Sequence, residues 1–329
     1  MPATITSSEL TRAAFRRSSE YPTPLPPEGG DLAQLARSWR RSLEDRDLSP
    51  NTIYIYLTSL KLFGQFLDDV GMPMLVGSIT AEHIREFLRH LEREGRAANT
   101  RTNRHQALAT FFAWVKAEGE RTDNPMLDVN RPKPKEVPPE LMPDEDVKKL
   151  LFVCRRDEDV FLGRRDEAII RMFFDTGARR SSVAYVRTRD LSLDEDPASV
   201  TFVGKGQHVY VAGIGRKAAA ALDRYLRVRA RHKHARNERL WVGRQGPLDD
   251  KAIDLILRKR AREAGVRVHA HMFRHAFAHA HLSHPDAKEG DIARQGGWRG
   301  TAMLRRYGAA AAEQRAREAH VRLGLGDRL

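Results

Sequence analysis

The sequence contains a single cysteine, Cys154, among its 329 residues. One thiol excludes an intrachain disulfide framework and any zinc site built from several cysteines. No apolar run approaches the roughly 18 residues that cross a bilayer. The first residues, MPATITSSEL, lack the basic and then apolar layout of a signal peptide. We therefore expect a protein of a reducing compartment with no membrane span.

Acidic residues are also scarce relative to basic ones. Lysine and arginine total 57 against 44 aspartates and glutamates, which gives a formal net charge of +13 and a pI near 10.1. Such an excess favours a polyanionic partner, of which nucleic acid is the commonest. With 41% hydrophobic and 31% charged residues, the composition is that of a globular chain. The length indicates two domains.

Two proline-rich stretches divide the chain. YPTPLPPEGG (21–30) disfavours helix and most sheet pairing, so residues 1–30 are predicted to be a flexible arm. RPKPKEVPPELMP (131–143) is stiff and polar, which is typical of an interdomain linker. The predicted domains are therefore residues 31–130 and residues 144–329.

The first domain has the pattern of a bundle of four or five helices. Asp31 is a candidate N-cap for a helix that ends near Arg46, and Ser49-Pro50 starts the next helix. That second helix carries an apolar stripe and ends at Gly71; Thr80 caps a third helix, and a fourth covers about 100–118. The expected inward residues are Ile53, Leu57, Leu60, Phe63, Leu67, Val70, Ile84, Phe87, Leu88, Leu91, Leu108, Phe111, Phe112 and Val115.

Basic residues lie between these apolar stripes. Each could meet a phosphate, and a solvated helix face explains any one of them equally well. They are Lys61, Arg96, Arg101, Arg104 and Lys116.

The second domain is predicted to be mixed. Residues 199–213 read as two short strands around a Gly204-Lys205-Gly206 turn, and Cys154 falls on an apolar helix stripe typical of a core. Helices are expected at 144–154, 164–176, 215–231, 249–264, 271–283, 286–296 and 310–323.

Four short segments of this domain carry chemically active side chains. They are Thr176-Gly177-Ala178-Arg179, the hairpin lysine Lys205, His271-Met272-Phe273-Arg274-His275, and Gly297-Trp298 with Tyr307 nine residues further on. In this order, after a helical bundle and a linker, the chain resembles the tyrosine recombinase (phage integrase) family over about residues 31–310. The helix segments at 49–67 and 99–115 and Asn124-Pro125 add to the resemblance.

The resemblance implies a mostly α fold with a small β-sheet. It comprises an N-terminal helical core-binding (SAM-like) domain and a C-terminal tyrosine recombinase catalytic domain. Residues 311–329 would form a short helix that contacts a neighbouring protomer. The implied partners are double-stranded DNA, three further copies in a homotetramer on two DNA sites, and an accessory or directionality protein. No membrane, metal or other cofactor is implied, and the site of action would be the cytoplasm. Residues 1–30 are too short and too proline-rich for a separate arm-binding domain, which favours a compact member, either Xer-like or a simple integrase.

The resemblance also assigns roles in phosphodiester chemistry. Arg179 and Arg274 would hold the nonbridging oxygens with planar, permanently charged donors. Tyr307 would attack phosphorus and form a 3′-phosphotyrosyl intermediate. Lys205 would protonate the leaving 5′-oxygen.

His271 would assist proton transfer at the tyrosine and donate to the phosphate. Trp298 occupies a position where most members carry histidine. Its indole N–H can donate, but it cannot shuttle a proton, and its ring can wedge the tyrosine segment in place.

Two positions depart from the family pattern. Ser182 stands where an acidic residue normally orients catalytic groups, so that support is weakened or passes elsewhere. Arg180 adjoins Arg179, and the Thr-Gly-x-Arg register assigns the catalytic role to Arg179.

Six histidines occupy positions 269–284, and three of them share an i, i+4 helical face. That spacing permits metal binding. The absence of HExxH and of an intervening carboxylate disfavours a metal site, and the family resemblance implies a structural role for His275. The three are His271, His275 and His279.

Two other functions fit part of the pattern. A type IB topoisomerase would use the same phosphotyrosine step but relax supercoils as a monomer. A catalytically silent DNA-binding protein would keep the fold, and Ser182 is the residue that motivates this alternative.

Overall fold

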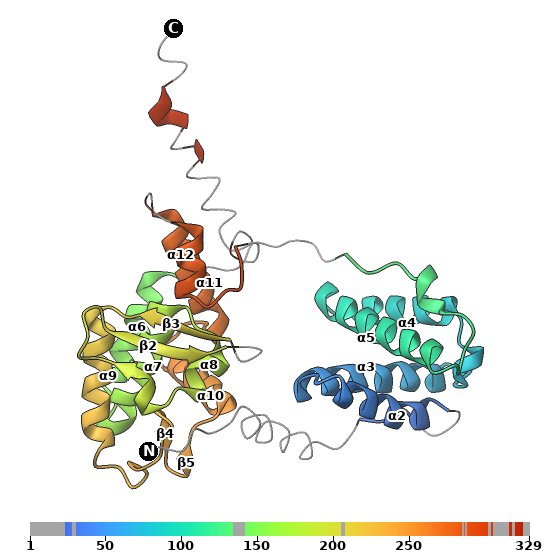
Figure 1. Cartoon of the computed structure of the whole chain (residues 1–329), viewed down its shortest axis with the longest axis horizontal. Coiled ribbons are helices and arrows are strands. Elements are labelled where there is room, and N and C mark those ends of the chain that lie inside the picture. The colour runs from blue at the N-terminus through green and yellow to red at the C-terminus, as the bar shows by residue number, and fades with distance from the viewer. Residues whose placement is uncertain are drawn as a thin grey trace. The chain divides into compact units, whose positions relative to one another are not determined.

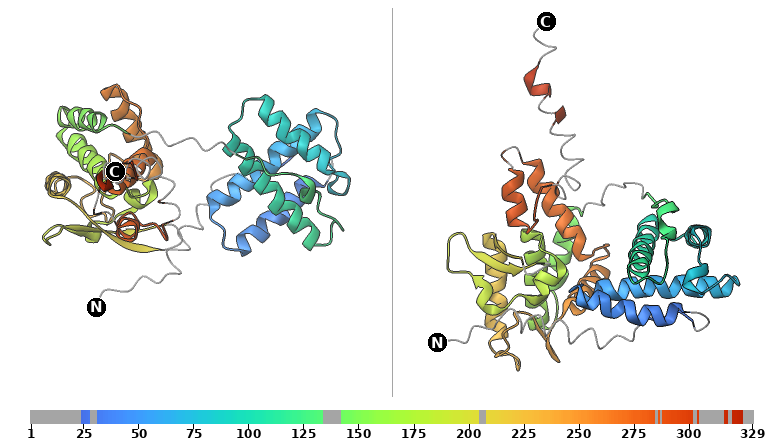
Figure 2. Two further views of the ribbon diagram at one scale, coloured as in Figure 1. Left: turned by 90° about the horizontal axis from the view of Figure 1, so that it is seen from above. Right: turned by 45° about the vertical axis from the view of Figure 1, so that its right-hand side comes forward.

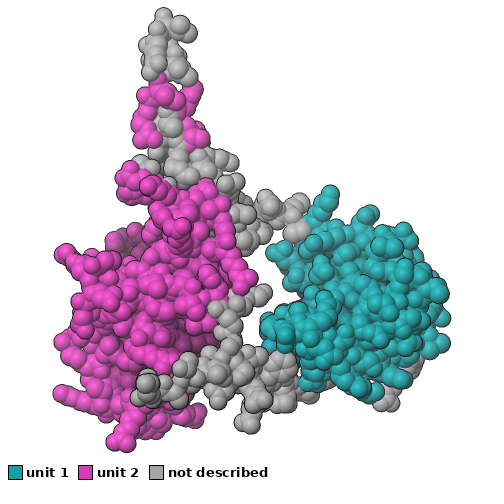
Figure 3. Space-filling view, viewed as in Figure 1, with its two compact units in different colours: residues 1–136 teal, residues 137–329 magenta. Residues whose placement is uncertain are grey.

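The structure is a computed structural model of the full chain. It describes residues 24–27, 31–133, 142–204, 208–284, 286, 288–301, 304, 316–317 and 320–324. The chain divides into two compact units, Met1–Glu136 and Val137–Leu329 (Figure 3). In the described part of the chain, no helix is both long and apolar enough to span a bilayer.

The first unit is a bundle of four α-helices in its described residues. Figure 2 (left) shows α4 and α5 crossing over α2 and α3. The predicted helices are confirmed. They are α2 (Leu32–Asp45), α3 (Pro50–Asp69), α4 (Ala81–Arg93) and α5 (Ala98–Ala117), with the short 3₁₀ helices η2 (Val76–Ser78) and η3 (Pro125–Asp128).

Helix α3 illustrates why these residues fold as they do. The Ser49 hydroxyl accepts a hydrogen bond from the backbone N–H of Thr52 at 3.2 Å, and Pro50 occupies the first turn. The predicted stripe is buried except at its end, where Val70 is 50% exposed. Asp31 precedes α2 as expected, but its carboxylate does not cap that helix. It accepts instead from the N–H of Val76 at 2.7 Å and so ties α2 to η2.

The core of the first unit is rich in aromatic rings. Trp39 meets Phe111 edge to face, with ring centres 5.1 Å apart, and Phe63 meets Phe87 at 5.2 Å. Four residues of the predicted arm, 24–27, belong to the described part. Leu25 packs against this core, and a Cβ added to Gly64 would lie 2.7 Å from Pro26.

The second unit surrounds helix α7 (Val160–Thr176), on which α6 (Asp144–Arg155), α9 (Arg216–Arg229) and α11 (Ala270–Ser283) pack (Figure 1). The described residues of this unit also form α8 (Arg180–Tyr185), α10 (Asp250–Ala264), α12 (Glu289–Gln295) and the 3₁₀ helix η4 (Thr188–Asp190). Cys154 is 1% exposed, and burial raises the pKa of its thiol to about 12, as expected of a core residue.

Two small sheets complete the second unit. Strands β1 (Leu191–Ser192), β2 (Ser199–Val203) and β3 (Val209–Gly213) form an antiparallel sheet in that order. The predicted hairpin is confirmed, with Phe202 opposite Tyr210 and Val203 opposite Val209. Strands β4 (Val242–Gly243) and β5 (Gly246–Pro247) form the second pair.

Some predicted boundaries were wrong. The helix expected from 164 begins at Val160, because the Asp159 carboxylate accepts from the N–H groups of Phe161 and Leu162. The helix expected over 286–296 is shorter, and helix α8 was not predicted. The predicted terminal helix at 310–323 lies largely outside the described residues.

Candidate active site

Arg179 is positioned by a sharp turn at the end of α7. Gly177 adopts a φ of 58°, and the Thr176 hydroxyl accepts from the N–H of Ala178 at 3.2 Å. The chain then extends through Arg179 into α8, and the Arg179 Nη1 donates to the carbonyl oxygen of Gly297 at 3.1 Å.

The neighbouring Arg180 points elsewhere. Its guanidinium pairs with Asp250 at 3.1 Å and Asp254 at 3.4 Å, both on α10. Of the two adjacent arginines, Arg179 is therefore the one that meets the other predicted site residues.

Arg274 lies on α11 and is 2% exposed. Its Nη1 donates to the carbonyl oxygens of Gly177 and Gly296, both at 2.7 Å. Burial of a guanidinium is tolerated where its donors find acceptors, and these two carbonyls accept from Nη1. Arg274 and Arg179 thus contact adjacent residues of one turn, Gly296 and Gly297.

Gln295 ties this turn to the sheet. Its side-chain amide donates to the carbonyl of Gly213 at 2.7 Å and accepts from the N–H of the same residue at 3.0 Å. Gly213 is the last residue of β3, and Gln295 is the last residue of α12, directly before Gly296 and Gly297. These hydrogen bonds therefore join the end of α12 to the end of β3. The turn that receives both arginines is therefore fixed to the hairpin strand.

His271 stands in the first turn of α11 and keeps an exposed side chain. The partial covering of the ring lowers its pKa, and the charges of Arg274, His269 and Arg179 lower it further. The neutral imidazole is thereby favoured near pH 7. The ring of His275 lies 4.4 Å from that of His271, edge to face, and His275 is buried, which agrees with a structural role.

Trp298 follows the glycine turn and is 6% exposed. Its ring packs against Phe277, with centres 6.2 Å apart. Leu304 is fully buried in the same cluster, only three positions before Tyr307. Trp298 therefore packs with the segment that leads to the predicted nucleophile.

Lys205 and Tyr307 themselves lie outside the described residues. The base of the lysine hairpin is described: the N–H of Gly204 donates to the carbonyl of His208 at 2.7 Å. A Cβ placed on Gly204 would lie 3.8 Å from the Arg179 Nη1. The residue before Lys205 is thus next to one of the two arginines.

Tyr210 belongs to this site, and sequence reasoning missed it. Its side chain is 7% exposed, and a Cβ on Gly297 would lie 2.4 Å from two carbons of its ring. The alternation along β3 does indicate that Tyr210 points inward beside Ala212. No local pattern reveals that its ring reaches the turn at Gly297.

Ser182, the departure from the family pattern, is 2% exposed on α8. Its hydroxyl donates to the carbonyl of Val203 at 3.1 Å. The position that usually carries an acid therefore links α8 to the last residue of β2.

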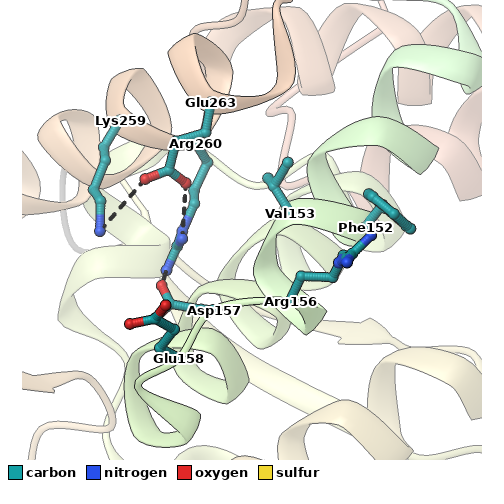
Figure 4. Close-up of a pocket in the computed structure, with 8 residues that line it drawn as sticks. All are labelled: Phe152, Val153, Arg156, Asp157, Glu158, Lys259, Arg260 and Glu263. Carbon is teal, nitrogen blue, oxygen red and sulfur yellow. Dashed lines mark hydrogen bonds and ion pairs between the residues drawn. The ribbon is translucent and has the colours of Figure 1, made fainter.

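A separate pocket of about 370 Å³ lies between α6 and α10 (Figure 4). Arg260 fills its polar side and pairs with Asp157 at 2.5 Å, Asp166 at 2.7 Å and Glu263 at 2.8 Å. Arg260 is thus engaged by three carboxylates, and the pocket contains none of the predicted site residues.

Two of the basic residues that the sequence offers as phosphate contacts in the first unit bind other side chains there. Arg104 donates to the Ser59 hydroxyl at 2.8 Å. Burial lowers the pKa of Arg104, and the charge of Arg96 lowers it further. Arg101 pairs with Glu92 at 2.5 Å. No group of three histidine, cysteine, aspartate or glutamate side chains is arranged to hold a metal among the residues that the structure describes.

Comparison with known proteins identifies the family. Residues 140–314 match the phage integrase family, and residues 37–119 match the phage integrase N-terminal SAM-like domain. The chain belongs to the phage integrase family. The predicted tyrosine recombinase membership and fold class are confirmed.

Two curated tyrosine recombinases illustrate the similarity. The chain is 27% identical over 240 residues to XerD of Listeria monocytogenes serotype 4b, covering 71% of this chain and 80% of that protein. It is 29% identical over 230 residues to XerC of Xanthomonas axonopodis pv. citri, covering 69% and 71%.

Solved structures of phage integrases and Xer recombinases share the fold. The XerH site-specific recombinase bound to palindromic difH substrate aligns with a TM-score of 0.69 at 16% identity, over 97% of this chain and 95% of that one. A lambda integrase tetramer bound to a Holliday junction aligns at 0.66 and 15% identity, over 84% and 77%.

Proposed function

We propose that this phage integrase is a site-specific DNA recombinase whose catalytic set is Arg179, Lys205, His271, Arg274, Trp298 and Tyr307. One observation carries the residue assignment. Arg179 donates to the carbonyl of Gly297, and Arg274, far away in the sequence, donates to the carbonyl of the preceding Gly296. Two guanidiniums fixed on one turn beside His271 form a site for a single phosphate group.

Cleavage exchanges one phosphate ester bond for another. The phenolic oxygen of Tyr307 attacks phosphorus, the bond from phosphorus to the 5′-oxygen breaks, and a 3′-phosphotyrosine forms. The phenolic proton leaves with the help of His271, whose lowered pKa favours the accepting neutral ring. Lys205 gives a proton to the departing 5′-oxygen. The phosphotyrosine keeps the energy of the broken bond, so a second 5′-hydroxyl can reverse the step without ATP.

Trp298 has a packing role in this proposal. Its ring shares a buried cluster with Phe277 and Leu304, and it lies against Arg274. It therefore replaces a hydrogen-bonding histidine with a large surface that fixes the arginine and the segment before Tyr307.

The proposed partner is double-stranded DNA, bound by a core-binding domain at 31–130 and a catalytic domain at 144–329. Four copies would act on two DNA sites, as in the lambda integrase tetramer on a Holliday junction. An accessory protein and a cytoplasmic site of action complete the proposal. Since lysine and arginine contacts release counterions, DNA affinity should fall steeply with salt.

The decisive experiment traps the covalent intermediate. Purified protein is mixed with nicked suicide duplexes from a random-sequence pool, and protein–DNA adducts are captured on a denaturing gel. An adduct that disappears in Tyr307→Phe supports the proposal. Specific binding without an adduct on any duplex favours the silent DNA-binding protein. Relaxation of a supercoiled plasmid by a monomer, with no paired sites, favours the topoisomerase.

A further inference from the structure

The buried Tyr210 has a position that simple packing does not require. Its ring lies so close to Gly297 that a Cβ added there would come within 2.4 Å of two ring carbons. A Cβ at Gly204 would lie 3.7 Å from a carbon of the same ring and 3.8 Å from the Arg179 Nη1. Tyr210 is therefore close to the residue before Lys205 and to the turn that holds both arginines.

The hydroxyl of Tyr210 faces polar groups. Burial raises its pKa, whereas the charge of Arg274, the hydroxyl of Ser182 and the charge of Arg179 act to lower it. The hydroxyl oxygen is fully covered and has no hydrogen bond of normal geometry within the described part of the chain. A covered phenol beside two guanidiniums is a ready acceptor for either of them.

Ser182 explains how this space is available. Its short side chain donates to the carbonyl of Val203 and leaves its oxygen beside the phenol. Both residues are attached to the same strand pair, because Val203 ends β2 and Tyr210 lies on β3. Two neutral hydroxyls thus occupy the region where the family pattern leads us to expect a carboxylate.

We propose that Tyr210 is a positioning residue for strand cleavage that, together with Ser182, supports Arg179 and Arg274 from the side of the sheet. This inference rests on the proposed function. A carboxylate in this place would hold the arginines but also cancel part of their charge. A phenol offers them a neutral acceptor and leaves their full charge for the phosphate and the developing phenolate.

The connection to the hairpin gives this arrangement a further consequence. Lys205 follows Gly204, whose N–H is bonded to His208, two positions before Tyr210. The hairpin of β2 and β3 thus carries both Lys205, the proposed general acid, and Tyr210, the proposed support of the two arginines. Loss of the phenol oxygen is therefore expected to slow cleavage without weakening DNA binding, which involves many other contacts.

The test compares two single-atom deletions. Tyr210→Phe removes the hydroxyl beside the arginines. Tyr225→Phe is the matched control, because the Tyr225 hydroxyl is also buried but donates to the carbonyl of Leu240 at 2.9 Å. For each variant we would measure the thermal midpoint, the Kd for the suicide duplex captured by the wild type, and the single-turnover rate of adduct formation below the midpoint.

We expect Tyr210→Phe to cleave roughly tenfold more slowly, which corresponds to an increase of about 1.4 kcal/mol in the activation free energy. Its Kd for the duplex should be unchanged. Tyr225→Phe should lower the thermal midpoint and cleave at the wild-type rate. In an Arg179→Lys background, Tyr210→Phe should have a much smaller effect on the rate, because the phenol acts through the arginine.

The contrary results are distinct. Cleavage by Tyr210→Phe at the wild-type rate overturns the inference and leaves Tyr210 as a packing residue. Equal slowing by Tyr225→Phe, or full additivity with Arg179→Lys, overturns it as well. Absence of an adduct from the wild type on every duplex overturns the proposed function first, and the inference with it.

Discussion

The guanidinium of Arg274 lies 3.6 Å from the centre of the Trp298 ring. This stacking places a cation on the negative face of an indole, an arrangement that is strongest when both groups are desolvated. Arg274 is 2% exposed and Trp298 is 6% exposed, so water screens little of the interaction. The tryptophan thus supports the arginine through its ring face, which a histidine could do only over a smaller area.

Replacement of Trp298 should therefore affect both folding and cleavage. Trp298→Ala removes the ring from a cluster that includes Phe277 and Leu304, and we expect a loss of about 3 kcal/mol in the free energy of unfolding. Trp298→Phe keeps a ring in contact with Arg274 and should retain most of the cleavage. Chemical denaturation and adduct formation at a temperature where all variants are folded would measure the two effects. Equal cleavage by the alanine and phenylalanine variants would contradict the stacking role.

The two adjacent arginines provide a sharp comparison. Arg179→Ala should abolish adduct formation while the protein remains folded, because the side chain donates to the carbonyl of Gly297, in the turn that also receives Arg274. Arg180→Ala loses only partly exposed pairs with Asp250 and Asp254, each worth about 0–1 kcal/mol. It should cleave at close to the wild-type rate. A reversed outcome in a suicide-substrate assay would move the catalytic role to Arg180.

The lowered pKa of His271 predicts a particular pH dependence. Partial burial, Arg274, His269 and Arg179 all disfavour the imidazolium. The neutral ring therefore persists below pH 6.5, the usual value, and cleavage should begin to fall only at more acidic pH. His271→Gln should cleave slowly at every pH and lose this acidic limb. Single-turnover rates between pH 5 and pH 8, measured under conditions where all variants stay folded, would show it.

The same shift has a consequence for stability. A histidine whose folded-state pKa lies below its unfolded value takes up protons more readily in the unfolded chain. Its contribution to stability is present above about pH 6.5 and is lost as the pH falls toward the folded-state pKa. Unfolding of His271→Gln should therefore depend less on pH in this window than unfolding of the wild type. An identical dependence in the two proteins would show that the folded-state pKa of His271 is not lowered.

The sequence predicts much of this fold because local signals decide it. The stripe along α3, the Ser49 cap and the hairpin over 199–213 each follow from spacing and turn residues close in the chain. Helix α8 and the two-residue strands are too short for a periodic signal. The sequence predicts Asp31 as the N-cap of α2, but its carboxylate accepts from the N–H of Val76, which is far away in the sequence.

The candidate site divides in the same way. Motif order indicates Arg179 and Arg274, which the structure brings to one turn, and His271, whose pKa responds to the charges of both arginines. The contribution of Tyr210 depends on the contact of β3 with Gln295 and Gly297, which are remote in the sequence. No period along either segment encodes that contact.

Gly297 gives the last prediction, because its missing side chain is what lets Tyr210 approach. Gly297 has a φ of 63°, and a Cβ there would lie 2.4 Å from the Tyr210 ring. Gly265 is the matched control: its φ is 66°, but no heavy atom lies within 4 Å of an added Cβ. Gly265→Ala should cost only the backbone strain, about 1 kcal/mol. Gly297→Ala should cost more, because it must also displace the ring.

The effect on activity separates the two variants further. Displacement of the ring at Gly297 moves the carbonyl that accepts from Arg179, so Gly297→Ala should slow adduct formation at least as much as Tyr210→Phe. Gly265→Ala should cleave normally. If the double variant Gly297→Ala with Tyr210→Ala regains part of the lost stability, the collision with the ring is the cause. If both glycine variants lose the same free energy of unfolding and cleave at the same rate, the close approach of Tyr210 to Gly297 contributes neither to stability nor to cleavage.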